Sequence, residues 1–150
     1  MEVIEYFLDE NKEHWKKQVA LADWRAAKFL FELLNDMRKF EELLGKGGKL
    51  FLLVDGEKIV SFVTLTRQDC IRDKSIFPWL GFLFTYPDYR GNRYSEKLLE
   101  YVEEEAKSEN YSIVCLGTDH IGLYEKYGYV YLETRKDYWN DEVRIYYKKL

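Results

Sequence analysis

Hydrophobic residues recur with two different spacings along the chain, and each spacing predicts a different kind of element. A strand is predicted at about Val3–Leu8, followed by a helix at Glu10–Leu21. From about Asp23, a residue type suited to an N-cap, apolar side chains then recur every three or four positions, at Trp24, Ala27, Leu30, Leu34 and Met37. This period predicts a second, longer helix with one buried stripe, which ends at the glycines of positions 45, 47 and 48.

The middle of the chain has the pattern of β-strands. Leu50–Val54 and Ile59–Leu65 flank Asp55-Gly56, a dipeptide that readily adopts positive φ and therefore favours a hairpin turn. Phe77–Thr85 is apolar nearly throughout, as expected of an interior strand that is covered on both faces.

Helices and strands alternate in the second half of the chain. A helix is predicted at Arg93–Glu109 and a buried strand at Ser112–Leu116, which must run parallel to the interior strand because a helix connects the two. A short helix at Ile121–Tyr127, ended by Gly128, precedes strands at Tyr129–Glu133 and Val143–Lys148. We therefore predict a single α/β domain over residues 1–150, with a mixed, mostly antiparallel sheet, a central parallel strand pair and helices on both faces.

Composition and charge exclude several classes of protein. With 47% hydrophobic and 33% charged residues in 150, the chain is not of the disordered type. A net charge of −4 provides no field to hold a polyanion, so no nucleic acid partner is expected. No apolar run approaches the roughly 18 residues of a membrane span, and the acidic N-terminus lacks the pattern of a secretory signal. We expect a cytoplasmic protein with reduced cysteines, no membrane contact and, because its two histidines and two cysteines are scattered, no metal.

The turn after the interior strand is the segment most suggestive of chemistry. It reads YPDYRGNRYS at residues 86–95. Backbone N–H groups at the start of the following helix can cradle a pyrophosphate, to which Arg90 and Arg93 would add positive charge. An isolated strand–turn–helix of this kind is more often an ordinary surface turn with solvated arginines.

Two segments together resemble a known family. Pro87, Arg90 and Gly91 with the following Leu98-Leu99, and LYEKYGY at residues 123–129, resemble the two signature regions of the GNAT superfamily of acyl-CoA-dependent N-acetyltransferases. The resemblance extends over nearly the whole chain and implies acetyl-CoA as the acyl donor. In that family the first region wraps the coenzyme A pyrophosphate, and the preceding strand holds the pantetheine arm by backbone hydrogen bonds. The cofactor-binding residues that it implies are Leu83, Phe84, Thr85, Arg90, Gly91, Asn92, Arg93, Tyr94 and Ser95.

The first region departs from the family pattern R/Q-x-x-G-x-G/A at one important place. Arg93 stands where the pattern has its first glycine, and Ser95 takes the place of the second small residue. A Cβ at position 93 lies where the backbone should approach phosphate closely, so either the turn tolerates it or the coenzyme sits differently. Charge-assisted hydrogen bonds from Arg93 to phosphate offer partial compensation.

The resemblance also implies catalytic residues. Tyr124 corresponds to the tyrosine that protonates the departing thiolate, a role that suits a phenol with a pKa of about 10; packing on the sheet is the alternative, and we assign Tyr127 and Tyr129 to packing. The interior strand has no carboxylate to act as general base. Asp119 and His120, just beyond the parallel strand, are candidates because ligands collect at the carboxyl ends of such strands, although Asp119 would equally serve to cap the next helix.

The function expected from these features is acetyl transfer from acetyl-CoA to a primary amine by direct attack, with a small molecule or a peptide as the acceptor. Asp69, Asp73 and nearby residues in the loop before the interior strand either line a site for a cationic amine or are simply solvated, and the sequence alone does not choose between the two. The rival interpretations are a non-catalytic coenzyme A-binding module and an interaction domain on the same fold. The aromatic C-terminal strand would allow a homodimer.

Overall fold

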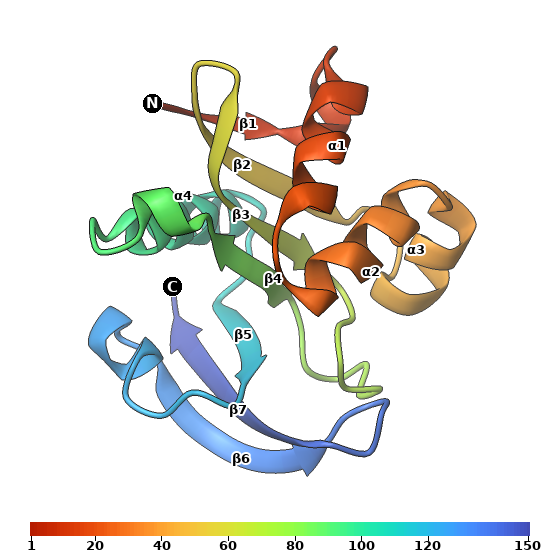
Figure 1. Ribbon diagram of the computed structural model, residues 1–150. Helices are drawn as coiled ribbons and strands as arrows, with labels where there is room; N and C mark the ends of the chain where they lie inside the picture. Colours follow the sequence, from red (N-terminus) through yellow and green to blue (C-terminus); the bar gives the residue numbers. More distant parts are fainter.

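The computed structural model describes residues 1–150 as one seven-stranded sheet flanked by helices (Figure 1). The strands, in the spatial order β1-β2-β3-β4-β5-β7-β6, are β1 Glu2–Glu5, β2 Lys49–Asp55, β3 Lys58–Thr66, β4 Trp79–Thr85, β5 Ile113–Thr118, β6 Val130–Lys136 and β7 Glu142–Lys149. The α-helices are α1 Lys12–Leu21, α2 Arg25–Leu34, α3 Met37–Leu44 and α4 Tyr94–Ser108. Three short 3-10 helices lie at Tyr6–Leu8, Pro87–Tyr89 and Tyr124–Tyr127.

The sheet confirms the predicted topology. The hairpin between β2 and β3 closes at the pair Asp55 and Lys58, so the Asp55-Gly56 turn is present as predicted. Every pairing is antiparallel except that of β4 with β5. The α/β class, the mostly antiparallel sheet and the single parallel pair are therefore all observed.

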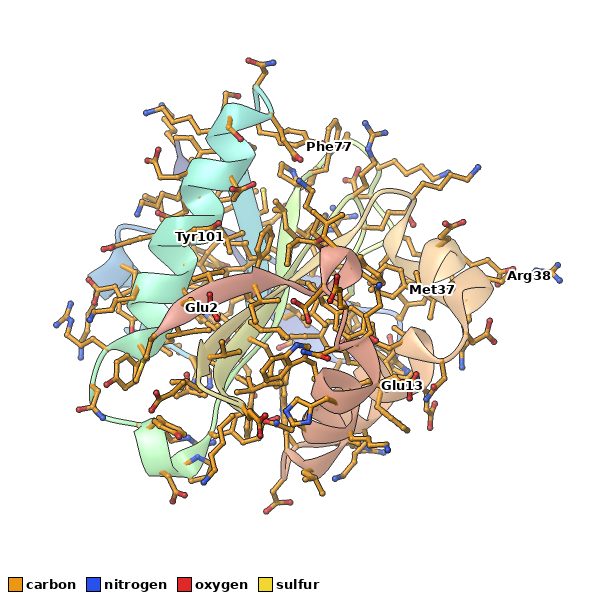
Figure 2. The ribbon with its side chains drawn as sticks, turned by 90° about the horizontal axis from the view of Figure 1, so that it is seen from above. Glu2, Glu13, Met37, Arg38, Phe77 and Tyr101 are labelled. Carbon is orange, nitrogen blue, oxygen red and sulfur yellow. The ribbon has the colours of Figure 1, made fainter.

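Helices cover the two faces of the sheet unequally. Helices α1 to α3 pack on one face through Val19, Ala27, Leu30 and their neighbours, and α4 packs on the other face through Leu98 and Val102. Seen from above, α4 with Tyr101 lies on one side of the sheet and α3 with Met37 on the other (Figure 2). None of these helices combines the length and the hydrophobicity that spanning a bilayer requires.

The predicted long helix is in fact two helices. It breaks at Asn35 and Asp36, where the Asp36 carboxylate accepts a hydrogen bond from the backbone N–H of Lys39 at 3.2 Å and so begins α3. A short polar side chain that caps a new helix competes with continuation of the old one. The proposed N-cap, Asp23, is also wrong by one residue, because Trp24 occupies that position without a side-chain cap.

Other boundaries shift for local reasons. The first strand ends at Glu5 because Tyr6–Leu8 form a 3-10 turn. The interior strand begins at Trp79 rather than Phe77, since Pro78 has no N–H to donate to a ladder. The helix predicted at Ile121–Tyr127 is reduced to the 3-10 turn at Tyr124–Tyr127, which Gly128 ends with φ of +90°, as predicted for that glycine.

Candidate active site

Strands β4 and β5 separate soon after they meet. Their parallel ladder consists of Trp79 with Cys115 and Leu80 with Leu116, so residues 81–85 of β4 have no strand partner on the β5 side. A bulge follows at once on the β3 side, where Phe82 and Leu83 lie opposite one residue of β3 and Phe82 has φ of +52°. A bulge bends a strand and interrupts its pairing, which leaves backbone groups of β4 free for a ligand.

A cavity of about 220 Å³ lies at the carboxyl end of β4. Its lining combines the predicted turn with one tyrosine from the β5–β6 connection: Thr85, Tyr89, Arg90, Gly91, Arg93, Tyr94, Ser95 and Tyr127. The Tyr127 hydroxyl lies 3.4 Å from the Ser95 hydroxyl. Tyr127, which we assigned to packing alone, therefore belongs to the lining as well, a placement that its motif position did not signal.

The start of α4 is open toward ligands. Arg93 occupies the N-cap position and makes no side-chain cap hydrogen bond, so the N–H groups of the first turn keep no partner within the helix. Gly91 has φ of +83°, and a Cβ built on it would meet no atom within 4 Å. Unpaired N–H groups, the positive end of the helix dipole and room beside the backbone are what a diphosphate requires. The residues present therefore fit the coenzyme pyrophosphate.

Arg93 occupies its position at a conformational cost. Its φ of +60° and ψ of +28° are left-handed, a region that favours glycine over residues with a Cβ. The backbone thus keeps the conformation suited to the glycine of the family pattern, although the side chain differs. The guanidinium pairs with Glu96, its Nε donating to Oε2 at 2.6 Å. Because this pair is exposed, it is weak enough to exchange for a bound phosphate.

The other predicted coenzyme residues have mixed roles. Arg90 donates from Nε to the Thr85 carbonyl at 2.9 Å and leaves its terminal N–H groups exposed. The Asn92 amide donates to the carbonyls of Tyr89 and Arg90, at 3.1 and 3.3 Å, and stabilises the turn. Phe84 is buried in the core, with its ring stacked on Trp24 at 5.6 Å, so only its backbone is available to a ligand. Leu83 is half-buried and packs toward α4.

Tyr124 lies in a cluster of tyrosines that includes Tyr127 of the cavity lining. Its ring centroid is 6.2 Å from that of Tyr127, 6.1 Å from Tyr129 and 6.4 Å from Tyr146, and the residue is 8% exposed. Burial raises the pKa of Tyr124 to about 12, with further contributions from Tyr127 and Asp119. The phenol is therefore protonated at neutral pH, as a proton donor must be.

A buried ionic network fixes the turn that carries Tyr124. Glu103 of α4 accepts from the Tyr129 hydroxyl at 2.6 Å and from Lys148 Nζ at 2.8 Å, and Lys148 also donates to the Tyr127 carbonyl at 2.9 Å. Burial and Glu103 both raise the pKa of Tyr129. Although Glu103 is charged, it is only 8% exposed, because it lies on the face of α4 that Tyr129 and Lys148 cover.

Asp119 and His120 are both exposed at the end of β5. The His120 N–H donates to the Thr118 hydroxyl at 3.0 Å. Asp119 does not cap the next turn, where Leu123 is the N-cap and Glu125 accepts from the Gly122 N–H at 3.1 Å. The charge of Asp119 makes a small contribution to the raised pKa of Tyr124.

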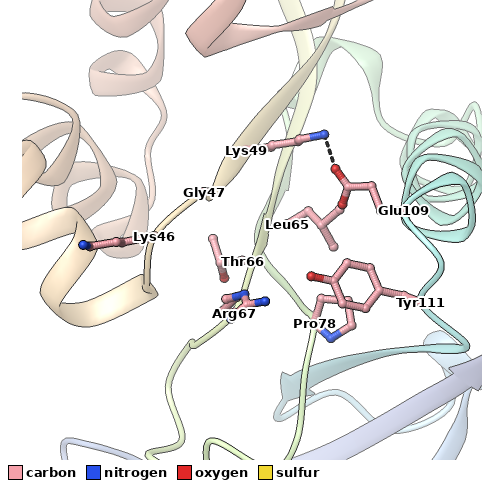
Figure 3. Close-up of a pocket in the computed structure, with 9 residues that line it drawn as sticks. All are labelled: Lys46, Gly47, Lys49, Leu65, Thr66, Arg67, Pro78, Glu109 and Tyr111. Carbon is pink, nitrogen blue, oxygen red and sulfur yellow. Dashed lines mark hydrogen bonds and ion pairs between the residues drawn. The ribbon is translucent and has the colours of Figure 1, made fainter.

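A second cavity, of about 240 Å³, opens at the opposite end of β4 (Figure 3). It is bordered by Lys46, Lys49, Arg67, Pro78, Glu109 and Tyr111, among others. Lys49 is engaged in an ion pair with Glu109. None of the predicted site residues contributes to this cavity, so the features of the candidate active site all gather at the carboxyl ends of β4 and β5.

Comparisons with known proteins identify the domain and its fold. The chain matches the acetyltransferase (GNAT) domain over residues 8–132, and no curated protein matches it. The aminoglycoside 6'-N-acetyltransferase from Enterococcus faecium is 18% identical, with a TM-score of 0.71 over 99% of this chain and 97% of that one. An acetyltransferase from Streptococcus agalactiae is 24% identical, with a TM-score of 0.69 over 99% and 98%. A GNAT family acetyltransferase from Elizabethkingia anophelis with acetyl-CoA bound is 16% identical, with a TM-score of 0.69 over 99% and 97%.

The structural likenesses establish the fold, and the domain match covers most of the chain. The resemblance carried by residues 87–99 and 123–129 is thereby confirmed. The chain belongs to the GNAT acetyltransferase family.

Proposed function

We propose that the protein transfers an acetyl group from acetyl-CoA to a primary amine by direct attack. The observation that carries this proposal is the open start of α4, with its unpaired N–H groups beside a cavity, at the end of a strand whose backbone is free along residues 81–85. The two features suit the two parts of coenzyme A, a charged diphosphate and an extended pantetheine arm.

Residues of the turn would hold the coenzyme. The backbone N–H groups of residues 91–95 would hold the diphosphate, and Arg90 would add charge-assisted hydrogen bonds from its free terminal N–H groups. Thr85 and the bulged residues of β4 would receive the pantetheine arm, and the Leu83 N–H would polarise the acetyl carbonyl. When bound, acetyl-CoA supplies the activated thioester.

Tyr124 is the proposed proton donor to the departing sulfur. The high pKa of its buried phenol keeps the proton in place but also makes Tyr124 a weak acid. Proton transfer must therefore accompany cleavage of the C–S bond, when negative charge develops on the sulfur. Tyr127, which lines the cavity beside Ser95, is proposed to position the coenzyme rather than to exchange protons.

The acceptor is proposed to be a cationic amine. The chain carries a net charge of −4, which favours approach of cations. Two of the similar solved structures are aminoglycoside 6'-N-acetyltransferases.

The test combines binding with turnover. Calorimetry with acetyl-CoA, followed by thiol release across a panel containing an aminoglycoside, a polyamine and an amino acid ester, should give both binding and release with at least one amine. Binding without release on any amine would favour the non-catalytic module, which the strained Arg93 and the absence of a carboxylate on β4 support. No thermal shift with coenzyme A would favour the interaction domain.

A further inference from the structure

Two glycines mark the point where β4 and β5 separate. Gly81 and Gly117 directly follow Leu80 and Leu116, the last parallel pair. A Cβ added to Gly81 would lie 2.2 Å from Asp69 Oδ1, and one added to Gly117 would lie 3.0 Å from Cys70 Sγ. The missing side chains therefore make room for two consecutive residues of the β3–β4 loop, which place a carboxylate beside Gly81 and a thiol beside Gly117.

An unpaired hydroxyl points to the same place. Thr64 Oγ1 lies 3.0 Å from the Cβ position of Gly81, next to the Asp69 carboxylate. Thr64 is fully buried, and its hydroxyl is the one buried side-chain oxygen or nitrogen without a hydrogen-bond partner. Leaving such a group unsatisfied costs about 1 to 3 kcal/mol. The Asp69 carboxylate and the unsatisfied Thr64 hydroxyl therefore lie beside the same glycine, where a polar group of a substrate would find an acceptor.

The loop that carries Asp69 is held in place by its neighbours. The Cys70 carbonyl accepts from the Tyr138 N–H at 3.0 Å, and Arg135 Nη1 of β6 pairs with Asp73 at 2.8 Å. The Arg72 guanidinium lies over the Tyr138 ring at 3.8 Å. Because residues 70, 72 and 73, which directly follow Asp69, are tied to the β6–β7 hairpin, packing defines the path of the loop that carries the carboxylate.

The surroundings of Asp69 contain no cation to balance it. Burial raises its pKa to about 6, and the only contacts that oppose this rise are hydrogen bonds from Cys70. Thr64 and Gly81, which lie beside the carboxylate, carry no charge. The negative charge of Asp137 in the β6–β7 loop helps to raise the pKa of the Cys70 thiol. Near neutral pH the carboxylate is therefore ionised, lacks a counter-ion and is basic enough to accept a proton.

Asp69 and Tyr124 lie on opposite faces of the sheet. Tyr124 packs with Leu80 and α4, whereas Gly81 and Asp69 lie on the face that Trp79 shares with Ile71. An amine approaching over Asp69 would therefore reach the opening between the strands from the side opposite to the phenol. In direct attack the base serves the incoming nitrogen and the acid serves the departing sulfur, and the two sides of the sheet would keep these roles apart.

We propose that Asp69 is the catalytic base that accepts a proton from the substrate ammonium, an assignment that rests on the proposed function. Asp69 becomes a carboxylic acid, and the freed nitrogen lone pair forms the C–N bond to the acetyl carbonyl. The C–S bond breaks with its electron pair on sulfur, which takes the Tyr124 proton. The second proton that nitrogen loses restores the phenol through water, and Asp69 releases its own proton to solvent.

The test compares Asp69→Asn with the wild-type protein, using thiol release with the best amine of the panel. We expect kcat/KM for the amine to fall about 100-fold at pH 7, with the Kd for acetyl-CoA by calorimetry unchanged. In the wild type kcat/KM should rise with pH through about 6, and the variant should lack that inflection. Asp23→Asn, which removes an exposed carboxylate, is the matched control and should keep both the rate and the profile.

A second pair of measurements separates catalysis from folding. A carboxyl group whose folded pKa is raised contributes stability at low pH that is lost as pH rises through about 6, so Asp69→Asn should melt a few degrees above wild type at pH 7.5 and close to it below pH 4. Gly81→Ala retains the carboxylate but displaces it, and should lower kcat/KM for the amine at least 10-fold.

Retention of the wild-type rate and inflection by Asp69→Asn would overturn the assignment while leaving the proposed function standing. If the wild-type protein binds acetyl-CoA but acetylates no amine, the proposed function fails and the role of Asp69 fails with it. A destabilised Asp69→Asn protein at pH 7.5 would identify Asp69 as a structural residue.

Discussion

The two ends of the proposed site are built in different ways. The coenzyme end consists of one continuous segment, Thr85–Ser95, whose useful groups are backbone N–H groups at the start of α4. The chemical end is assembled from Thr64 on β3, Asp69 in the following loop and Tyr124 beyond β5. One end depends on local backbone conformation, and the other depends on long-range packing.

This difference determines how each end of the site should respond to amino-acid substitutions. Backbone groups at a helix start survive most side-chain substitutions, so single changes there should alter affinity moderately. At the chemical end each side chain comes from a separate segment, and no neighbouring group can take over its role. Loss of one of these side chains should therefore lower kcat strongly. Substitutions at the two ends therefore test that contrast.

Removing the phenol oxygen tests the chemical end most directly. Tyr124→Phe should lower kcat about 100-fold with little change in acetyl-CoA affinity, because the hydroxyl acts only as the C–S bond breaks. Tyr101→Phe, on the exposed side of α4 (Figure 2), is the matched control. An unchanged kcat in Tyr124→Phe would remove Tyr124 from the mechanism.

The network beneath Tyr124 should matter for stability more than for binding. Glu103→Ala leaves the Tyr129 hydroxyl and Lys148 without their partner and should lower the free energy of unfolding by about 2 kcal/mol, as measured in urea. Glu104→Ala, its exposed neighbour on α4, should change it by no more than about 0.5 kcal/mol. Equal effects of the two substitutions would mean that the network does not stabilise the fold.

Charge at the coenzyme end should affect affinity alone. Arg90→Glu should weaken acetyl-CoA binding about 10-fold at low salt and less at high salt, because the side chain is exposed and its charge is screened. Arg38→Glu, on α3 away from the turn (Figure 2), should leave the affinity unchanged. A loss that does not vary with salt would place the pyrophosphate elsewhere.

The smallest effect concerns backbone conformation at the same end. Arg93→Gly and Arg93→Ala both remove the ion pair with Glu96, but only glycine adopts φ of +60° without strain. The glycine variant should therefore be more stable than the alanine variant by about 1 kcal/mol. Alanine equal to or better than glycine would show that the left-handed conformation does not persist.

Local signals in the sequence predicted most of the fold. The Asp55-Gly56 hairpin, the parallel strand pair and the open turn before α4 follow from neighbouring residues, and all are present in the structure. The break between α2 and α3 at Asp36 was missed because the helical spacing of apolar residues continues through it to Met37. The Asp36 side chain caps α3, and this cap ends the helical path that the spacing predicted.

The chemical end could be predicted only in part. Tyr124 was proposed as the proton donor from its position in the motif. Asp69 was one of several acidic residues in a loop, and a loop has no periodic pattern from which the direction of a side chain can be predicted. Its significance depends on Gly81 and Gly117, which make room for the loop only after the sheet has formed. Glu103 was missed for a similar reason, since its partners Tyr129 and Lys148 come from distant strands.

The ion pair between Asp73 and Arg135 has a practical consequence for kinetic experiments. Hydrogen bonds from Ser75 and Arg135 lower the pKa of Asp73 to about 2. The anchor of the β3–β4 loop therefore keeps its charge throughout the range in which an acetyltransferase is assayed, and it would weaken only as the pH falls well below 4. An activity change between pH 5 and 8 thus reports on groups that titrate within the site, not on loosening of the loop that carries them.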